Sequence, residues 1–453
     1  MKGAPARKAA LEVLIKVDQN SAYANIALSA ALERSQMSER DKAFITALVL
    51  GTLRNRNSID EKLNSLASRP LVKMPVSLRN ILRLSLFQLE QMPDIPASAV
   101  VNTGVDLARQ TGHKGQAAFV NGLLRNYLRH NDGSAGTTPD ASLDLSLEEK
   151  LARDFSMPNW LVKKWLKDWG EAEATSLLKF QQEPPALVLR TCTTAIEPSG
   201  LKLILENQGL ELEQSKLVKA CFIVKSRGKH KGKIENIPGY EDGMFAVQDE
   251  PSAFISLVLG PKPGELVYDL CAAPGSKTLH LAELMEAKGR VIAIDIHAKR
   301  LNFIASARKR LSLDNIDIIE ADATKWQPER LADKVLIDAP CTGSGVIAKR
   351  SDARFTKSEP DLESLVSLQR ALLNQGAKLA KPDGTIVYST CSVEKEENDD
   401  NIEWFLANHS EYQEEKIELA EFEPSPSKHG FQFLPSRHGL PGYFVCKLKR
   451  IGS

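Results

Sequence analysis

The hydrophobic residues of this chain change their spacing once, and that change limits the folds open to it. Through residues 7–129 they recur every three or four positions, as at Ile45, Leu48 and Val49, which predicts helices that each bury one face. From residue 264 onward, short apolar segments alternate with helical ones. The predicted strands are residues 266–270, 291–295, 316–322, 335–338 and 385–389. This alternation predicts a doubly wound, mostly parallel α/β sheet of the Rossmann-like class.

The chain has 453 residues, enough for about three domains at ~150 residues each. We expect an all-α domain over residues 1–131 and a linker over 132–145, which is rich in Gly, Ser, Thr, Asp and Pro. A small α/β domain is expected over 146–240 and an α/β catalytic domain over 241–453. The domain order is therefore helical, mixed and doubly wound.

Local patterns place several elements. Ser38 with Asp41, and Ser146 with Glu149, are capping-box patterns that predict helix starts. Residues 158–169 predict a helix whose tryptophans belong to a core, with Gly170 as its stop. Residues 221–224 predict a strand.

The charge is unevenly distributed. Lys and Arg number 59 and Asp and Glu 58, and a net charge of +1 argues at first sight against a nucleic-acid binder. Residues 1–130, however, hold 18 basic and 10 acidic residues, a net +8 that leaves −7 for the rest. Residues 215–234 hold seven Lys and Arg and no acid, which is compatible with a solvated loop or with a phosphate-binding one. Phosphate binding is thus expected to be local and salt-dependent.

Six cysteines, at positions 192, 221, 271, 341, 391 and 446, show neither metal-ligand spacing nor a disulfide framework, so we expect no metal. The N-terminus lacks the apolar core of a signal peptide, and the apolar segments are far shorter than the ~20 residues of a membrane span. These features predict a cytoplasmic monomer without membrane association.

The first predicted strand leads into a loop of small residues and then a helix near Thr278. The loop residues are Cys271, Ala272, Ala273, Pro274, Gly275, Ser276 and Lys277. Small residues let the backbone approach a ligand, and a helix start offers unpaired N–H groups. The segment matches neither the Walker P-loop nor the G-x-G-x-x-G pattern.

Acidic residues end the next three predicted strands. Asp295 lies 26 residues after Asp269, a spacing that suits a carboxylate facing ribose hydroxyls. Asp322 is placed to face an adenine amino group, and Asp338 ends the fourth strand. Three such acids in register predict a nucleotide-type ligand.

Two cysteines follow strand ends on the same predicted edge of the sheet. Cys341 lies in residues 338–345 (DAPCTGSG) and Cys391 in residues 388–392 (YSTCS). A single buried cysteine is usually inert packing, but two at one edge, one of them just past Asp338, favour covalent catalysis.

These three motifs, with Glu396, Glu397 and Asn398 downstream, resemble the Nop2/Sun family of RNA cytosine-5 methyltransferases over residues 248–450. Residues 119–125 (FVNGLLR) make the N-terminal region similar to the RNA-binding NusB domain. Together they resemble the Sun type of bacterial 16S rRNA methyltransferase. Ser276 stands where the family usually has a second Gly, and residues 441–443 (PGY) replace the common Asp-Gly-Phe.

The resemblance implies S-adenosylmethionine as methyl donor, S-adenosylhomocysteine as product and cytosine 967 of 16S rRNA as target. It makes Cys391 the nucleophile, Cys341 the residue that assists release, and Asp338 the partner of the cytosine ring. Lys277 is either an active-site cation or an ordinary surface lysine. The loop residues 271–277, Asp295, Asp322 and Asp338 are the expected cofactor contacts.

Other interpretations stay open at this point. In DNA cytosine-5 methyltransferases the Pro-Cys motif supplies the nucleophile, which here would be Cys341. The chain could instead be a non-catalytic NusB-like RNA-binding or antitermination factor, or a methyltransferase for tRNA, another rRNA cytosine, a protein or a small molecule.

Overall fold

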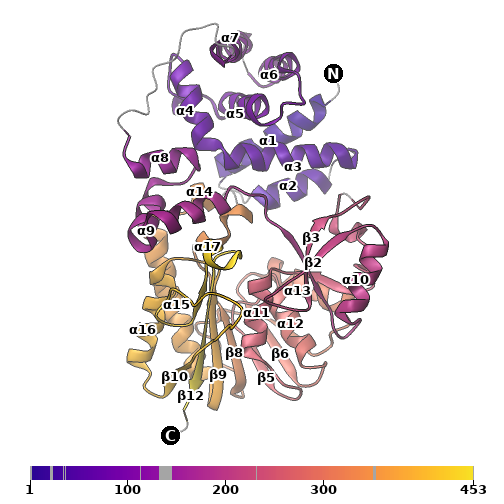
Figure 1. Cartoon of the computed structure of the whole chain (residues 1–453), viewed down its shortest axis with the longest axis vertical. Coiled ribbons are helices and arrows are strands. Elements are labelled where there is room, and N and C mark those ends of the chain that lie inside the picture. The colour runs from indigo at the N-terminus through magenta and orange to yellow at the C-terminus, as the bar shows by residue number, and fades with distance from the viewer. Residues whose placement is uncertain are drawn as a thin grey trace. The chain divides into compact units, whose positions relative to one another are not determined.

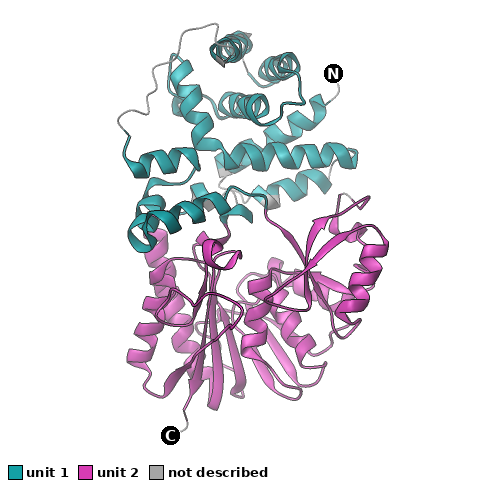
Figure 2. Cartoon of the chain, in the orientation of Figure 1, with its two compact units in different colours: residues 1–184, 347–357 teal, residues 185–346, 358–453 magenta. Residues whose placement is uncertain are grey.

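The structure is a computed structural model that describes residues 3–20, 24–33, 35, 37–112, 114–131, 145–230, 232–349 and 353–451. The chain forms two compact units (Figure 2): residues 1–184 with 347–357, and residues 185–346 with 358–453. The expected linker, residues 132–145, lies outside the described residues except for Leu145. Within the described ranges, every helix is too short or too polar to cross a membrane.

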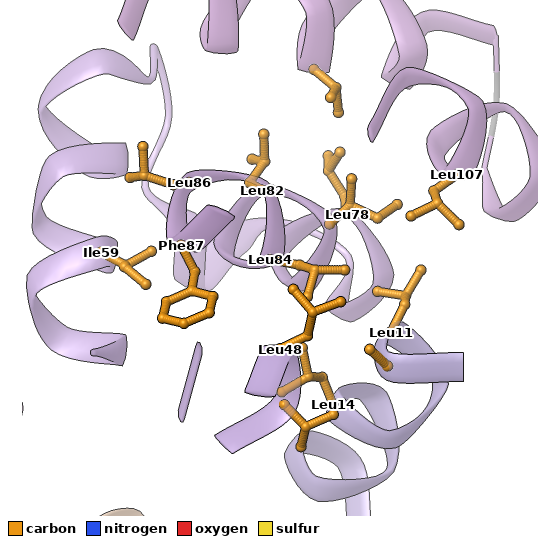
Figure 3. Packing of buried hydrophobic residues seen from close by; sticks show 14 of the residues in the cluster. Leu11, Leu14, Leu48, Ile59, Leu78, Leu82, Leu84, Leu86, Phe87 and Leu107 are labelled. Carbon is orange, nitrogen blue, oxygen red and sulfur yellow. The ribbon is translucent and has the colours of Figure 1, made fainter. Parts of the chain in front are cut away.

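The first unit is helical, as the spacing predicted (Figure 1). Its elements are α1 (Ala4–Asn20), α2 (Ala24–Glu33), α3 (Glu39–Arg54), α4 (Arg56–Leu66), η1 (Leu71–Lys73), α5 (Val76–Gln91), α6 (Ala97–Thr111), α7 (Lys114–Asn131), α8 (Leu147–Asp154), α9 (Asn159–Phe180) and α14 (Ala353–Thr356). Helix α5 is buried around most of its circumference, and Leu82 and Leu84 lie among leucines of other helices (Figure 3). It therefore forms the centre of the hydrophobic core.

The helix starts expected from capping patterns are confirmed. Ser38 accepts a hydrogen bond from the backbone N–H of Asp41, and Ser146 forms a complete capping box with Glu149. The expected helix stop at Gly170 is confirmed, because its backbone is not helical. Gly170 has φ of 79° and ψ of 170°, so the helix that begins at Asn159 stops there, and a second helix under the same label α9 runs on to Phe180.

One buried arginine side chain donates hydrogen bonds to the C-terminal ends of three helices in this unit. Arg354, 1% exposed, donates to the carbonyl oxygens of Arg54 and Phe155, each at 3.0 Å, and to that of Gln181. These carbonyls lie at the C-terminal ends of α3, α8 and α9, where the helix leaves oxygen atoms unpaired and the dipole is negative. The Arg354 guanidinium thus attaches residues 347–357 to the helical unit by hydrogen bonds to three helix ends.

The second unit begins with a four-stranded antiparallel sheet in the order β2-β3-β1-β4. Its elements are β1 (Leu187–Thr191), α10 (Pro198–Asn207), β2 (Glu211–Gln214), β3 (Cys221–Ser226), η2 (Ile234–Asn236) and β4 (Phe245–Val247). The strand predicted at residues 221–224 is confirmed. In the basic segment that follows, Arg227 folds back and donates to the carbonyls of Gly232 and Lys233, and Lys225 pairs with Glu213.

A larger sheet follows in the order β10-β12-β9-β8-β5-β6-β7, with β11 paired to β12. The strands are β5 (Leu266–Asp269), β6 (Arg290–Asp295), β7 (Ile316–Glu320), β8 (Ala332–Asp338), β9 (Ala380–Thr390), β10 (Tyr412–Glu415), β11 (Phe431–Phe433) and β12 (Tyr443–Arg450). Strands β5 to β9 pair in parallel, and β10, β11 and β12 add antiparallel strands. The doubly wound, mostly parallel sheet is confirmed.

Both faces of this sheet are covered by helices (Figure 1). These are α11 (Glu250–Leu259), α12 (Ser276–Leu284), α13 (Ala298–Arg310), α15 (Glu359–Leu379) and α16 (Asp399–Asn408), with η3 (Ser344–Lys349), η4 (Lys395–Glu397) and α17 (Pro435–His438) in the loops. Leu336 and Val387 join the core made with α11, α12 and α13, whereas Ile337 and Tyr388 join that made with α15 and α16. Successive residues point to opposite faces, so strands buried on both sides read as continuous apolar segments.

We expect Arg354→Met to destabilise the helical unit by about 2–4 kcal/mol, because the carbonyl oxygens at three helix ends lose a charged donor. Thermal and urea unfolding would measure the loss. Arg109→Met is the control, since its exposed pair with Asp106 is worth under about 1 kcal/mol. Equal stability of the Arg354→Met variant and the wild type would contradict this account.

Candidate active site

Two loops that each carry a cysteine leave the same edge of the large sheet. Strands β8 and β9 are parallel, and their register sets Asp338 opposite Ser389. Cys341 follows the first and Cys391 the second within three residues, so the two loops emerge together. The Sγ atoms of Cys341 and Cys391 are 3.4 Å apart, within hydrogen-bond distance. Thiols 50 positions apart in the sequence therefore form a pair.

The two thiols differ from the buried cysteines of the fold. Cys341 and Cys391 are partly exposed, whereas Cys192, Cys221 and Cys446 are buried. The hydrogen bond with Cys391, followed by burial, raises the pKa of the Cys341 thiol well above its ordinary value. Cys341 therefore keeps its proton and can donate it to the sulfur of Cys391.

Asp338 links the cysteine edge to the small-residue loop. Its Oδ2 accepts from Lys277 Nζ at 2.8 Å, and its Oδ1 accepts from Ser389 Oγ at 2.9 Å. Lys277 is 6% exposed, which contradicts the alternative of an ordinary surface lysine. A buried ammonium group and a partly exposed carboxylate thus form an ion pair at the sheet edge that carries the two thiols.

The loop over residues 271–275 makes a close turn into α12, which begins at Ser276, two residues before the predicted start. Gly275 caps the helix with φ of 111°, and a Cβ there would lie 2.6 Å from Ile304. Below the turn, Asp269 Oδ2 accepts from Thr278 Oγ1 at 2.7 Å, while the buried Oδ1 has no partner among the described residues. Burial raises the pKa of Asp269 to about 7.

The other two predicted acids differ in setting. Asp295 ends β6 and is buried; its oxygens accept from the N–H groups of Ala273 and His297, at 3.1 and 2.9 Å. Asp322 does not end a strand as predicted, because β7 stops at Glu320. Its Oδ1 instead accepts from Thr324 Oγ1, a bond that lowers its pKa.

These residues fit a nucleotide-type cofactor. Gly275 makes the tight turn that leads directly into α12, and α12 supplies N–H groups at its start. Asp269 Oδ1 is a buried acceptor without a hydrogen-bond partner among the described residues, and each oxygen of Asp295 keeps a second lone pair.

Two residues near Lys277 carried no role in the sequence analysis. The ammonium of Lys277 lies 5.8 Å from the ring centre of Tyr443. Tyr443 OH donates to Asp249 Oδ2 at 3.3 Å. The signal in the sequence was a departure, since Tyr443 stands where the resembling family commonly has Phe and so adds a hydroxyl.

Family models match three stretches of the chain. Residues 256–449 match "16S rRNA methyltransferase RsmB/F", residues 4–129 match the NusB family, and residues 157–230 match the RsmF/B-like ferredoxin-like domain. The helical, ferredoxin-like and Rossmann-like parts of the fold therefore agree with the predicted fold class.

Curated relatives cover nearly the whole chain. The chain is 34% identical to the probable ribosomal RNA small subunit methyltransferase B of Synechocystis over 98% of this chain and 99% of the relative. It is also 34% identical to the protein of that name from Bacillus subtilis, over 100% of both chains.

Solved structures share the fold. The crystal structure of PH0851 has a TM-score of 0.84 at 27% identity and covers 99% of both chains. A methyltransferase homolog protein from Pyrococcus horikoshii has a TM-score of 0.60 at 27% identity, over 68% of this chain and 100% of its own.

The buried carboxyl of Asp269 gives a pH prediction. Its folded pKa of about 7 lies above the ordinary 3.8, so its stabilisation is fully present below about pH 4 and is lost as pH rises through 7. Asp269→Asn cannot ionise. Relative to wild type, its free energy of unfolding should therefore rise by about 2–3 kcal/mol from pH 5 to pH 8.

Urea unfolding at several pH values would measure that difference. Asp317→Asn, which changes a half-exposed carboxyl on β7, is the control and should follow the wild-type profile. A pH-independent difference between Asp269→Asn and wild type would show that Asp269 is ionised in the folded protein.

Proposed function

Because the chain belongs to the ribosomal RNA small subunit methyltransferase B family, we propose that it methylates C5 of a cytosine in 16S rRNA with S-adenosylmethionine as donor. The coarser activity, methyl transfer to RNA, follows from the family. The observation that carries the finer proposal is the pair of thiols 3.4 Å apart beside Asp338 and Lys277.

The chemistry of cytosine explains why a thiol is needed. C5 is a poor nucleophile until the conjugation of the ring is broken by addition at C6. Cys391 is proposed as the thiolate that forms the bond to C6. C5 then takes the methyl group, which the bound cofactor supplies from its sulfonium. Loss of the C5 proton and cleavage of the bond between Cys391 and C6 complete the reaction.

The other residues of the edge have separate parts. Asp338 is proposed to hydrogen-bond N3 and the exocyclic amine of cytosine, which stabilises the activated ring. Lys277 holds that carboxylate in place through the 2.8 Å ion pair. The proton on Cys341 favours thiolate at Cys391 before addition. At release Cys341 is proposed to assist loss of the C5 proton as a helper, because its raised pKa argues against its acting as the base.

The cofactor is proposed to bind along the loop of residues 271–277. The N–H groups at the start of α12, the oxygens of Asp295 and the exposed side of Asp322 are its proposed contacts. Asp269 is added to this set because its buried Oδ1 has no partner among the described residues.

The RNA is proposed to be held mainly by the helical region, which carries the +8 charge, with help from the basic segment after β3. Arg227 and Lys225 contribute least there, since each is engaged within the sheet region. The division into domains at residues 131, 145 and 240 remains part of this proposal.

Two cysteine variants test the chemistry. Cys391→Ala should give no covalent protein–RNA adduct and lower methyl transfer by about 10³-fold or more, because the nucleophile is gone. Cys341→Ala should still form the adduct and accumulate it, since release is impaired. Gel analysis after incubation with 16S rRNA and S-adenosylmethionine measures both.

Cys446→Ala, in a buried cysteine of β12, is the matched control and should behave as wild type. An adduct that survives Cys391→Ala and vanishes with Cys341→Ala would reverse the two assignments. Failure to bind S-adenosylmethionine in calorimetry would instead favour a non-catalytic RNA-binding protein.

The target is tested separately. Bisulfite sequencing of rRNA from a deletion strain should lose one 5-methylcytosine signal in 16S rRNA, and the gene carrying Cys391→Ala should not restore it. Loss of a signal only in tRNA would contradict the rRNA substrate.

A further inference from the structure

Two consecutive buried residues contact both cysteine loops. Glu397 ends η4 and Asn398 caps α16, and their exposures are 0% and 2%. Tyr388 of β9 anchors this corner, because its hydroxyl donates to the backbone carbonyl of Glu397 at 2.7 Å. Neither Glu397 nor Asn398 belongs to the proposed chemical machinery.

Glu397 fixes the loop that carries Cys341. Its Oε1 accepts from the backbone N–H of Thr342 at 2.9 Å, and its Oε2 accepts from Thr342 Oγ1 at 2.6 Å. On the other side of the cysteine, Gln369 Nε2 donates both to Glu397 Oε1 and to the carbonyl of Pro340, at 2.9 and 2.8 Å. The Glu397 carboxylate thus fixes Thr342 directly and Pro340 through Gln369, which are the residues on either side of Cys341.

Asn398 does the same for the loop that carries Cys391. Its Oδ1 accepts from Thr390 Oγ1 at 2.6 Å, and its Nδ2 donates to the carbonyl of Ser392 at 3.0 Å. Gln432 Nε2 donates to the same carbonyl at 3.2 Å. Both neighbours of Cys391 are thus fixed by one carboxamide.

The loops are also joined to each other inside this network. Ser392 Oγ lies 3.2 Å from Thr342 Oγ1 and 3.1 Å from Ser344 Oγ, and Gly345 N donates to the carbonyl of Cys391 at 3.1 Å. Buried networks of this kind hold one arrangement because each broken bond leaves a polar group without water.

We propose that Glu397 and Asn398 are positioning residues that set the separation of the two thiols. One peptide unit fixes both loops, so the sulfurs are paired before RNA arrives and the cost of ordering them is already met. A carboxylate is needed at 397, since both of its oxygens accept. A carboxamide is needed at 398, since it must accept from Thr390 and donate to Ser392, on the two sides of Cys391. The catalytic consequence rests on the proposed function, whereas the thiol geometry does not.

Phenylarsine oxide measures the thiol geometry without RNA or cofactor. Its arsenic forms two As–S bonds, one to each thiol, and the two thiol protons leave with its oxygen as water. Binding is tight only when the sulfurs are already close. Cys341→Ser must abolish this two-thiol binding, which identifies the pair.

Glu397→Gln and Asn398→Asp should each weaken arsenical binding by about tenfold or more, because the first replaces an accepting oxygen and the second removes the donor to Ser392 and Gln432. Asn315→Asp is the control: Asn315 is 3% exposed and donates to the carbonyl of Ala282, far along the chain from either cysteine loop. It should leave arsenical affinity unchanged. If Glu397→Gln does not fold, Thr342→Val removes the hydroxyl contacts with Glu397 and Ser392 but keeps the backbone bond to Glu397, and it should weaken binding several-fold.

Arsenical affinity equal to wild type in Glu397→Gln and Asn398→Asp would overturn the proposal, as would an equal loss in Asn315→Asp. In the methylation assay, the positioning variants should lower kcat and leave the calorimetric affinity for S-adenosylmethionine unchanged. Weakened arsenical binding in a protein that methylates no RNA would refute the proposed function and support the positioning role. Unchanged arsenical binding in an active enzyme would do the reverse.

Discussion

The in-register pairing of β8 with β9 is the constraint on which the site depends. Because Asp338 lies opposite Ser389, the loops that follow these strands begin at neighbouring positions on the carboxyl edge of the sheet. A slip of one residue would turn Asp338 to the other face and separate the thiols. Strands buried on both faces resist such a slip, since their apolar residues pack against α12 on one side and α15 on the other.

The sheet decides the edge from which the two cysteine loops emerge, and the polar network of Glu397 and Asn398 decides the distance between the two thiols. Strand ends bring Cys341 and Cys391 to one edge, but loops that leave an edge still have freedom to diverge. The hydrogen bonds of Glu397 and Asn398 remove that freedom, and Lys277 does the same for Asp338. The chemistry is therefore carried by partly exposed groups whose neighbours in the chain are fixed by buried ones.

Much of the fold was predictable because it follows from periodicity. Helical spacing before residue 130 indicates a bundle of helices, and strand–helix alternation after residue 264 indicates a parallel sheet covered by helices. The errors arose where local signals were overruled. Asp322 lies beyond β7, because its side chain forms a turn with Thr324. Arg354 gave no local signal, since its partners come from three distant helices.

The sequence by itself determined the residue types of the site, since small residues at 271–277, acids near strand ends and two cysteines are local patterns. It did not determine distances. That Lys277 is buried against Asp338, that two sulfurs lie 3.4 Å apart and that Glu397 reaches Thr342 are facts about residues 50 or more positions apart. Only strand register and helix packing decide such separations, because they depend on how all the apolar faces are buried together.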